Sequence, residues 1–367
     1  MSKEVHVSST LIIAEAGVNH NGQLDLAYQL VDAAVKAGVD IIKFQTFKAE
    51  NLVTREAEQA DYQKINTDIV ESQYTMLKKL ELTFDEHLLV HDYCQRQGIA
   101  YLSTAFDAQS LEFLIQDIDL AILKIPSGEL TNTPLLLEHA YTGRRLIVST
   151  GMATLADIKL ALGVIAFGFL NRTDKTSKPS LAAFSAAYDS AAGKKLLAEN
   201  VSLLHCTTEY PAPIEEVNLN AMALMHDEFS LPIGYSDHTK GILIPAIAVA
   251  KGAVIIEKHF TLSRNMQGPD HKASLEPEEL EQMVKDIRQV ELALGRKVKA
   301  PTISEQKNIV VARKSIVASQ SIKQGEYYSV DNLTVLRPGG GISPVNYFNL
   351  LGTQANKDYD SGELITL

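Results

Sequence analysis

The stretch AVIIEKHFT, residues 253–261, begins as a buried β-strand does and then carries charged and titratable side chains. Alternate side chains of a strand share a face, so Glu257 and His259 point one way while Lys258 and Phe260 point the other. A carboxylate and an imidazole are therefore expected to face the same space. Lys258, on the opposite face, is expected to form an outward ion pair and to lie outside the site.

Seven earlier stretches have the same character, and segments of helical pattern separate them. The clearest helix is predicted for residues 24–37, with Gly38 as its C-cap. Eight strand–helix units in about 250 residues favour a (β/α)₈ TIM barrel of the α/β class over an open doubly wound sheet. A dinucleotide fold is disfavoured because no Gly-x-Gly-x-x-Gly follows the first strand. The expected strands cover residues 11–19, 39–47, 99–106, 121–129, 145–152, 201–209, 231–239 and 253–261.

Each expected strand is apolar at its start and carries polar side chains at its C-terminal end. These ends converge on one face of a barrel, where barrel enzymes keep their active sites. Solvation of strand ends is the alternative explanation, but it does not account for the same pattern in every strand. The pattern therefore predicts an active site that includes Glu15, Lys43, Gln45, Thr104, Ser127, Ser149, Ser236, His238, Glu257 and His259.

Two lysines at these strand ends, Lys43 and Lys124, predict an anion site. With neighbouring hydroxyls they offer cationic and neutral donors to a phosphate or carboxylate, in a chain that has no Walker-type loop. Taken singly, each of these hydroxyl residues is more typical of a turn or a cap than of a ligand contact. The hydroxyl donors are Thr104, Ser127, Ser149 and Ser236.

His238 and His259 end neighbouring strands and predict a site for one divalent cation. Two imidazoles completed by water or substrate suit a Lewis-acid Mn, Zn, Fe or Co site better than a closed structural one. The alternative is a pair of hydrogen-bonded rim histidines. Cys206 has no base partner in the sequence and is interpreted as a small buried residue rather than a nucleophile.

Composition limits the partners and the compartment. The net charge of −11 argues against a nucleic-acid binder. The N-terminal MSKEVHVSST lacks the pattern of a signal peptide, and no apolar stretch approaches the length of a membrane span. The two cysteines, Cys94 and Cys206, suit a reducing cytoplasm. A cytoplasmic protein without nucleic-acid or membrane partners is expected.

The strand–helix pattern stops after the helix expected to end near residue 294. We expect a catalytic barrel at 1–294, a linker at 295–307 and a small domain of short strands and glycine turns at 308–367. In this domain Arg337 and Pro338 precede a glycine run, which predicts a fixed bend beside an exposed arginine. Such a small domain is suited to cap another site, including that of a neighbouring subunit.

A series of motifs in order along the chain resembles the bacterial sialic acid synthase family, that is, N-acetylneuraminate synthase and its legionaminic acid relatives. The resemblance runs from about Leu11 to Leu367 and is specific because the motifs occur in register. The motifs are IAEAGVNHNG, KFQTFKAENLV, STAFD, KIPSGELTN, VSTGMAT, HCTTEYPAP, GYSDHT, IEKHFT, GPDHKASLEP and LRPGGGISP.

The resemblance implies a barrel followed by a C-terminal antifreeze-like (SAF) domain, in a domain-swapped homodimer. It implies condensation of phosphoenolpyruvate with an N-acetylated mannosamine to a nine-carbon 2-keto acid, with release of phosphate. The implied metal is Mn²⁺, with Mg²⁺ or Co²⁺ as alternatives, held by His238 and His259. The metal would polarise the aldehyde of the open-chain sugar.

Individual roles are carried over by position. Glu15 corresponds to the family's acid/base glutamate, and Glu257 is implied as a second base and a sugar contact. Thr207 and Thr208 stand where other members have an asparagine, so that sugar contact is expected to differ. The implied phosphoenolpyruvate contacts are Lys43, Thr104, Lys124, Ser127, Ser149 and Ser236, and the sugar contacts are Gln45, Tyr210, Asp270 and, from the partner subunit, Arg337.

The expected activity is N-acetylneuraminate synthesis from N-acetylmannosamine. The first alternative is legionaminic acid synthesis from 2,4-diacetamido-2,4,6-trideoxymannose. Further alternatives are another phosphoenolpyruvate-condensing synthase that makes a 3-deoxy sugar acid, and a non-catalytic carbohydrate-binding protein.

Overall fold

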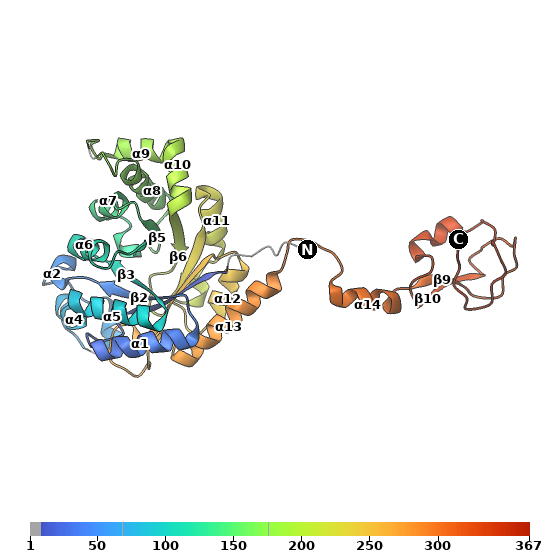
Figure 1. The fold of residues 1–367 in the computed structure, drawn as a ribbon, viewed down its shortest axis with the longest axis horizontal. Coiled ribbons are helices and arrows are strands. Elements are labelled where there is room, and N and C mark those ends of the chain that lie inside the picture. The colour runs from blue at the N-terminus through green and yellow to red at the C-terminus, as the bar shows by residue number, and fades with distance from the viewer. Residues whose placement is uncertain (1–8, 68, 175) are drawn as a thin grey trace. The chain divides into compact units, whose positions relative to one another are not determined.

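The structure is a computed structural model that describes residues 9–67, 69–174 and 176–367, and in these ranges eight parallel strands close into a barrel (Figure 1). The strands follow one another around the barrel in sequence order, and β1 pairs with β8. Each lies within a stretch that the sequence predicted, so the (β/α)₈ barrel is confirmed. The strands are β1 (Leu11–Gly17), β2 (Ile41–Thr46), β3 (Ala100–Ala105), β4 (Ile122–Ile125), β5 (Arg145–Ser149), β6 (Val201–His205), β7 (Ile233–Asp237) and β8 (Ile255–His259).

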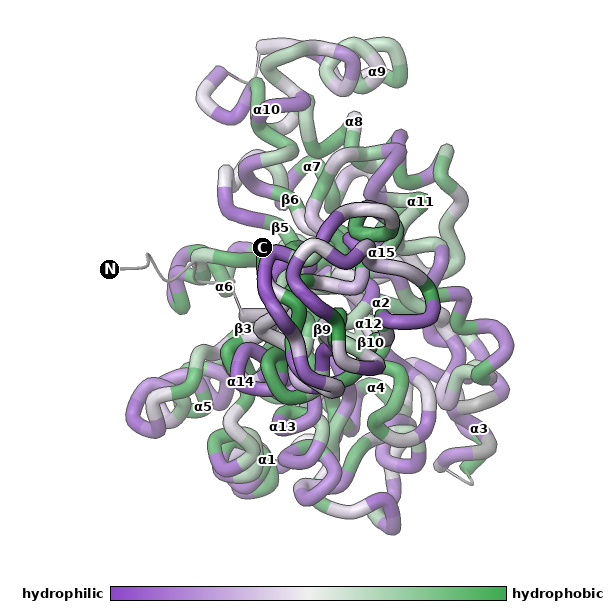
Figure 2. The backbone as a smooth tube through the Cα atoms, turned by 90° about the vertical axis from the view of Figure 1, so that its right-hand side faces the viewer, coloured by the Kyte–Doolittle hydropathy of each residue, from purple (hydrophilic) through white to green (hydrophobic). Residues whose placement is uncertain are grey.

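Helices cover the outside of the barrel (Figure 1). The first has the predicted bounds and ends at Gly38, which takes the left-handed conformation with φ 76°. Hydrophilic and hydrophobic residues alternate along outer helices such as α5 (Figure 2). No helix in the described ranges combines the length and apolar character needed to cross a membrane. The helices are α1 (Leu24–Ala37), α2 (Ala49–Leu52), α3 (Asp61–Thr67), α4 (Gln73–Leu80), α5 (Phe84–Gln97), α6 (Ala108–Gln116), α7 (Thr133–Tyr141), α8 (Leu155–Leu170), α9 (Leu181–Asp189), α10 (Ala191–Asn200), α11 (Asn220–Phe229), α12 (Leu243–Ala250) and α13 (Pro277–Leu294).

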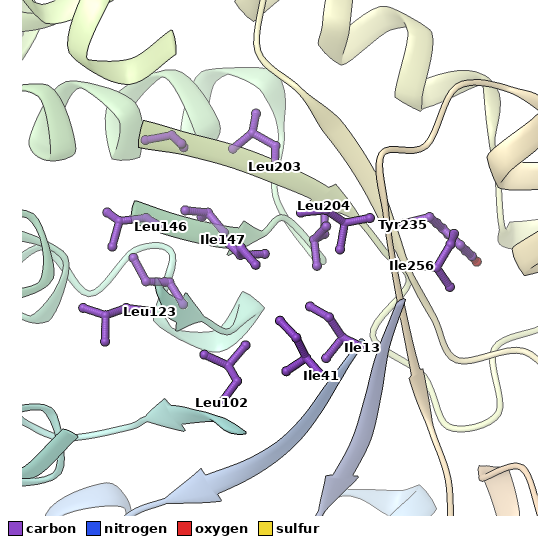
Figure 3. Packing of buried hydrophobic residues seen from close by; sticks show 14 of the residues in the cluster. Ile13, Ile41, Leu102, Leu123, Leu146, Ile147, Leu203, Leu204, Tyr235 and Ile256 are labelled. Carbon is purple, nitrogen blue, oxygen red and sulfur yellow. The ribbon is translucent and has the colours of Figure 1, made fainter. Parts of the chain in front are cut away.

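Apolar side chains from the strands form one large buried cluster (Figure 3). Ile13 and Leu203 have no exposed surface, and Leu123 is 1% exposed. Burying an aliphatic side chain of this kind contributes about 1.5–3 kcal/mol. This packing fixes the strands, so the polar residues at their C-terminal ends are held by a rigid frame.

The long connection between β5 and β6 contains two short helices after α8. The chain bends between these two helices at Ser190. Ser190 has extended backbone angles, and its Oγ accepts a hydrogen bond from the Gly193 N–H at 2.9 Å. It therefore ends α9 and caps α10. Both helices pack beside α8 on the outside of the barrel (Figures 1 and 2).

The chain divides into two compact units, Met1–Gly295 and Arg296–Leu367. The first helix of the second unit is α14 (Ile303–Ala312). It crosses the boundary at residues 307–308 that was predicted between the linker and the small domain. Thr302 and Glu305 form a capping box that starts this helix. An antiparallel pair of short strands follows, as expected for a small domain of this composition. These strands are β9 (Ser315–Ala318) and β10 (Leu333–Leu336), and α15 (Tyr347–Leu350) lies after them.

Candidate active site

A cavity of about 300 Å³ lies where the C-terminal ends of the barrel strands converge. All the site residues predicted in the first unit line it. These are Glu15, Lys43, Gln45, Thr104, Lys124, Ser127, Ser149, Tyr210, Ser236, His238, Glu257, His259 and Asp270. Glu257 and His259 therefore face the same space, as the alternation of side chains along residues 253–261 predicted.

Four buried charged side chains form the floor of the cavity. The Nζ atom of Lys43 lies 2.7 Å from Oε2 of Glu15 and 3.7 Å from Oε2 of Glu257. The Nζ atom of Lys124 lies 3.6 Å from Oε1 of Glu257. Strand register produces this arrangement, since Glu15 and Lys43 are direct partners across β1 and β2. Each side chain is at most 5% exposed, so the charges interact with little screening.

The two carboxyl groups have opposite pKa shifts. Burial raises the pKa of Glu15 to about 7, against the attraction of Lys43. Burial also acts to raise the pKa of Glu257, but Lys124, Lys43 and the Ser236 hydrogen bond outweigh it and lower the pKa to about 2. At neutral pH Glu257 is therefore a carboxylate, while Glu15 can both hold and release a proton.

Hydroxyl groups complete the surroundings of the lysines. Lys43 Nζ donates to Thr104 Oγ1 at 3.2 Å, and Lys124 Nζ donates to Ser149 Oγ at 2.6 Å. Ser236 Oγ donates to Glu257 Oε1 at 2.9 Å. Of the four hydroxyls predicted for the anion site, Thr104 and Ser149 are therefore adjacent to the lysines, whereas Ser236 binds Glu257 and Ser127 accepts from Gly151.

Gly151, which the sequence analysis did not single out, contacts residues that line the cavity. Its N–H donates to Ser127 Oγ at 3.0 Å. A Cβ atom at this position would collide with Thr208 Oγ1 and would lie 2.8 Å from Ser127 Oγ and 3.1 Å from Cys206 Sγ. Glycine therefore allows the β5 end to approach the β6 end closely. Cys206 is buried at 5% exposure, as expected for a packing residue.

His238 and His259 lie side by side, with ring centroids 5.5 Å apart. Nδ1 of His238 is 2.6 Å from the Thr207 carbonyl oxygen, which can only accept, so Nδ1 is the donor and Nε2 keeps its lone pair. Nδ1 of His259 is buried without a hydrogen-bond partner among the described residues, and the nearest carboxylate oxygen, Asp270 Oδ2, is 3.9 Å away. Burial lowers the pKa of both imidazoles, which favours the neutral, ligating form.

These two histidines fit a divalent cation as a pair of ligands with open remaining positions. Within the described ranges, no three His, Cys, Asp or Glu side chains are grouped as a complete metal site. The donor set therefore matches a Lewis-acid site completed by substrate or water rather than a structural cage.

The loop after β8 places Asp270 at the cavity. Ser274 Oγ donates to the Asp270 carbonyl oxygen at 2.7 Å, and Asn66 Nδ2 donates to the Pro269 carbonyl oxygen at 2.7 Å. Burial raises the pKa of Asp270 to about 6. The first bond closes the loop on itself and the second ties it to α3, so Asp270 has a defined position.

Arg337 belongs to the second unit, where it is exposed and its Nε donates to the Ala312 carbonyl oxygen at 3.0 Å. Its sugar contact in a partner subunit stays a prediction.

Two features of the site region differ from the sequence analysis. Lys258 does face away from the cavity and does pair with a carboxylate, Asp237, at 2.6 Å, but both side chains have no exposed surface. The sequence analysis also missed an apolar lining from the segment after β2. No local motif marks this lining, because its residues follow an ordinary helical pattern. It comprises Leu52, Val53, Met76, Leu77 and Leu80, together with Val18 and Phe106.

Known proteins are similar to this chain over nearly its whole length. The NeuB family model matches residues 30–299, and the SAF domain model matches residues 313–367. A Campylobacter jejuni protein named N,N'-diacetyllegionaminic acid synthase is 47% identical over 98% of this chain and 99% of its own length. A Legionella pneumophila protein of the same name is 43% identical over 96% of this chain and 92% of its own.

A solved structure extends the similarity to the fold. The crystal structure of N-acetylneuraminic acid synthetase from Leptospira borgpetersenii has a TM-score of 0.65 and 33% identity, over 82% of this chain and 90% of that chain. The family model covers most of the barrel, and the relatives match along nearly the whole chain. The chain therefore belongs to the NeuB family, with a SAF domain at its C-terminal end.

Proposed function

We propose that this enzyme condenses phosphoenolpyruvate with 2,4-diacetamido-2,4,6-trideoxymannose and water to give N,N'-diacetyllegionaminic acid and phosphate. The observation that carries the reaction type is the buried pair Lys43 and Lys124, surrounded by hydroxyls and by Glu15 and Glu257, inside one cavity. The choice of sugar rests on the two relatives named for this product. N-acetylmannosamine, the first expectation from the sequence, becomes the second candidate.

The two lysines bind and orient phosphoenolpyruvate. Its phosphate and carboxylate are anions, and a cation held in a low-dielectric cavity attracts them far more strongly than one in water. Lys43 and Lys124 converge on the same carboxylate, Glu257, so their ammonium groups already face a common point. The hydroxyls of Thr104 and Ser149 lie beside them and add neutral donors.

The reaction needs one proton delivered and one removed. A bond forms between C3 of phosphoenolpyruvate and the sugar aldehyde carbon, and the aldehyde oxygen takes a proton. Water adds at C2 and loses one proton. The remaining C2 hydroxyl passes its proton to the phosphate as the C2–O bond to phosphate breaks, which leaves the C2 ketone. Glu15, which is beside Lys43 and able to exchange a proton near neutral pH, fits both transfers.

His238 and His259 would hold the divalent cation that the family implies. When bound, the cation supplies Lewis-acid polarisation of the aldehyde. The hydrogen bond from His238 Nδ1 to Thr207 fixes the ring and presents Nε2. Mn²⁺ as the physiological ion, a domain-swapped homodimer and a cytoplasmic location remain predictions.

Replacing either histidine with alanine is expected to weaken Mn²⁺ binding to the folded protein by tenfold or more, because half of the proposed protein ligands are lost. Equilibrium dialysis with metal analysis measures this independently of turnover. His91→Ala, on the outer helix α5, is the control and should bind as the wild type does. If His238→Ala and His259→Ala both keep full affinity, the metal assignment is wrong.

The activity is tested by phosphate release from phosphoenolpyruvate with the two acetamido sugars side by side. We expect a higher kcat/KM for the 2,4-diacetamido sugar. A higher kcat/KM for N-acetylmannosamine would instead indicate N-acetylneuraminate synthesis, the activity first expected from the sequence. Turnover with arabinose 5-phosphate alone would indicate a different phosphoenolpyruvate-condensing synthase, and no release with any sugar would favour a non-catalytic binding protein.

A further inference from the structure

We propose that an apolar wall in the cavity selects the acceptor by binding the methyl groups carried at its C4 acetamido group and at C6. This inference rests on the proposed function and extends it to the residues that read the sugar. The wall consists of Val18, Leu52, Val53, Met76, Leu77, Leu80 and Phe106.

The wall and the catalytic floor belong to the same cavity but differ in chemistry. The floor comes from the ends of the barrel strands and is charged, whereas most of the wall comes from α2, α4 and the residue after α2. Leu52, Val53 and Leu77 are only partly buried, so they present apolar surface to the cavity. Gln63 and Gln73 of the same segment also line the cavity, so this side is uncharged and mostly apolar. An acceptor whose aldehyde lies at the floor extends its distal carbons toward this uncharged side.

Packing behind the wall holds it in place. Val18 and Met76 are each 4% exposed and form a small hydrophobic cluster with Phe47 and Leu80. The Ala49 N–H donates to Glu81 Oε1 at 2.5 Å, which joins the start of α2 to the end of α4. Gly22, with φ +69°, lets the loop after β1 approach the Lys79 carbonyl oxygen more closely than a side chain would permit. These contacts hold the side chains of the wall in a defined position.

The two candidate acceptors differ at C4 and C6, the carbons whose substituents would contact this wall. N-acetylmannosamine has hydroxyls at C4 and C6, whereas the 2,4-diacetamido-6-deoxy sugar has an acetamido group and a methyl group there. A hydroxyl or an amide placed against apolar side chains loses its hydrogen bonds to water, but a methyl group gains by burial, so the wall would contact the C6 methyl and the methyl end of the acetamido group. The wall therefore favours the sugar with more methyl groups and disfavours the more hydroxylated one.

The test changes the polarity of the wall with little change in shape. Val53→Thr is nearly isosteric, and Leu77→Gln places an amide at a second position. The controls are Val254→Thr and Leu89→Gln, whose positions are 42% and 48% exposed and do not line the cavity. For each full-length protein, kcat/KM is measured with phosphoenolpyruvate, saturating Mn²⁺ and each sugar.

We expect each wall variant to lower the ratio of kcat/KM for the 2,4-diacetamido sugar over N-acetylmannosamine by about tenfold or more, the effect typical of a changed pocket contact. The controls should keep the wild-type ratio. If the ratio is unchanged in Val53→Thr and Leu77→Gln, the wall does not select the acceptor, even if kcat/KM falls equally for the two sugars. The wild-type ratio separately tests the proposed acceptor, so the two ideas can fail independently.

Discussion

Replacing Glu15 with glutamine is expected to lower kcat for phosphate release by about 10²- to 10⁴-fold, the usual contribution of a positioned acid or base. Glutamine keeps the shape of the side chain but cannot exchange a proton. Lys43 would still have Glu257 at 3.7 Å, so the cavity should keep its fold and bind phosphoenolpyruvate. The effect should therefore appear in kcat, with a much smaller change in KM for phosphoenolpyruvate.

Steady-state kinetics with phosphate detection measures this prediction, and circular dichroism checks the fold. Glu112→Gln, on the exposed face of α6, is the matched control and should leave kcat unchanged. If Glu15→Gln keeps more than a tenth of the wild-type kcat, the acid/base role belongs to another group. Glu257 is the next candidate, although a carboxyl group with a pKa near 2 is a weak base at neutral pH.

Strand-by-strand alternation explains why much of the site could be predicted from the sequence. A side chain at the C-terminal end of a barrel strand has a known direction, and the fold brings all such ends together. Glu257, His259 and Lys43 were found in this way, and their contacts depend on registers that a closed barrel largely fixes. The chemistry of the floor is thus a consequence of local pattern and topology.

Features that depend on packing between distant segments could not be predicted in this way. Most of the apolar wall comes from α2, α4 and the residue after α2, whose side chains would look the same in a segment that faced only the core. The close approach of Gly151 to Thr208 and Ser127 has no signal in either local sequence. The direction of Lys258 followed from alternation, but its complete burial depends on the helices that cover the barrel.

Replacing Lys258 with methionine is expected to lower the free energy of unfolding by about 3–5 kcal/mol, because it leaves a buried carboxylate without its cation. Lys258 Nζ lies 2.6 Å from Asp237 Oδ2 and also donates to the Thr239 carbonyl oxygen. Methionine is similar in length, so the loss measures the missing charge rather than a cavity. The chain has no tryptophan, so urea unfolding is followed by far-ultraviolet circular dichroism.

A double variant separates the charge from the packing. Adding Asp237→Leu to Lys258→Met removes the stranded carboxylate and should recover most of the lost stability, since apolar replacements of buried ion pairs are often neutral. Lys285→Met breaks the pair with Glu281, whose side chains are 57% and 33% exposed, and should cost about 0–1 kcal/mol. A single Lys258→Met variant as stable as this control would show that Asp237 is satisfied by other groups. The expected loss would instead show that the pair joins β7 to β8 beside His238 and His259. This role explains a buried lysine in a strand whose other side chains are apolar or line the cavity.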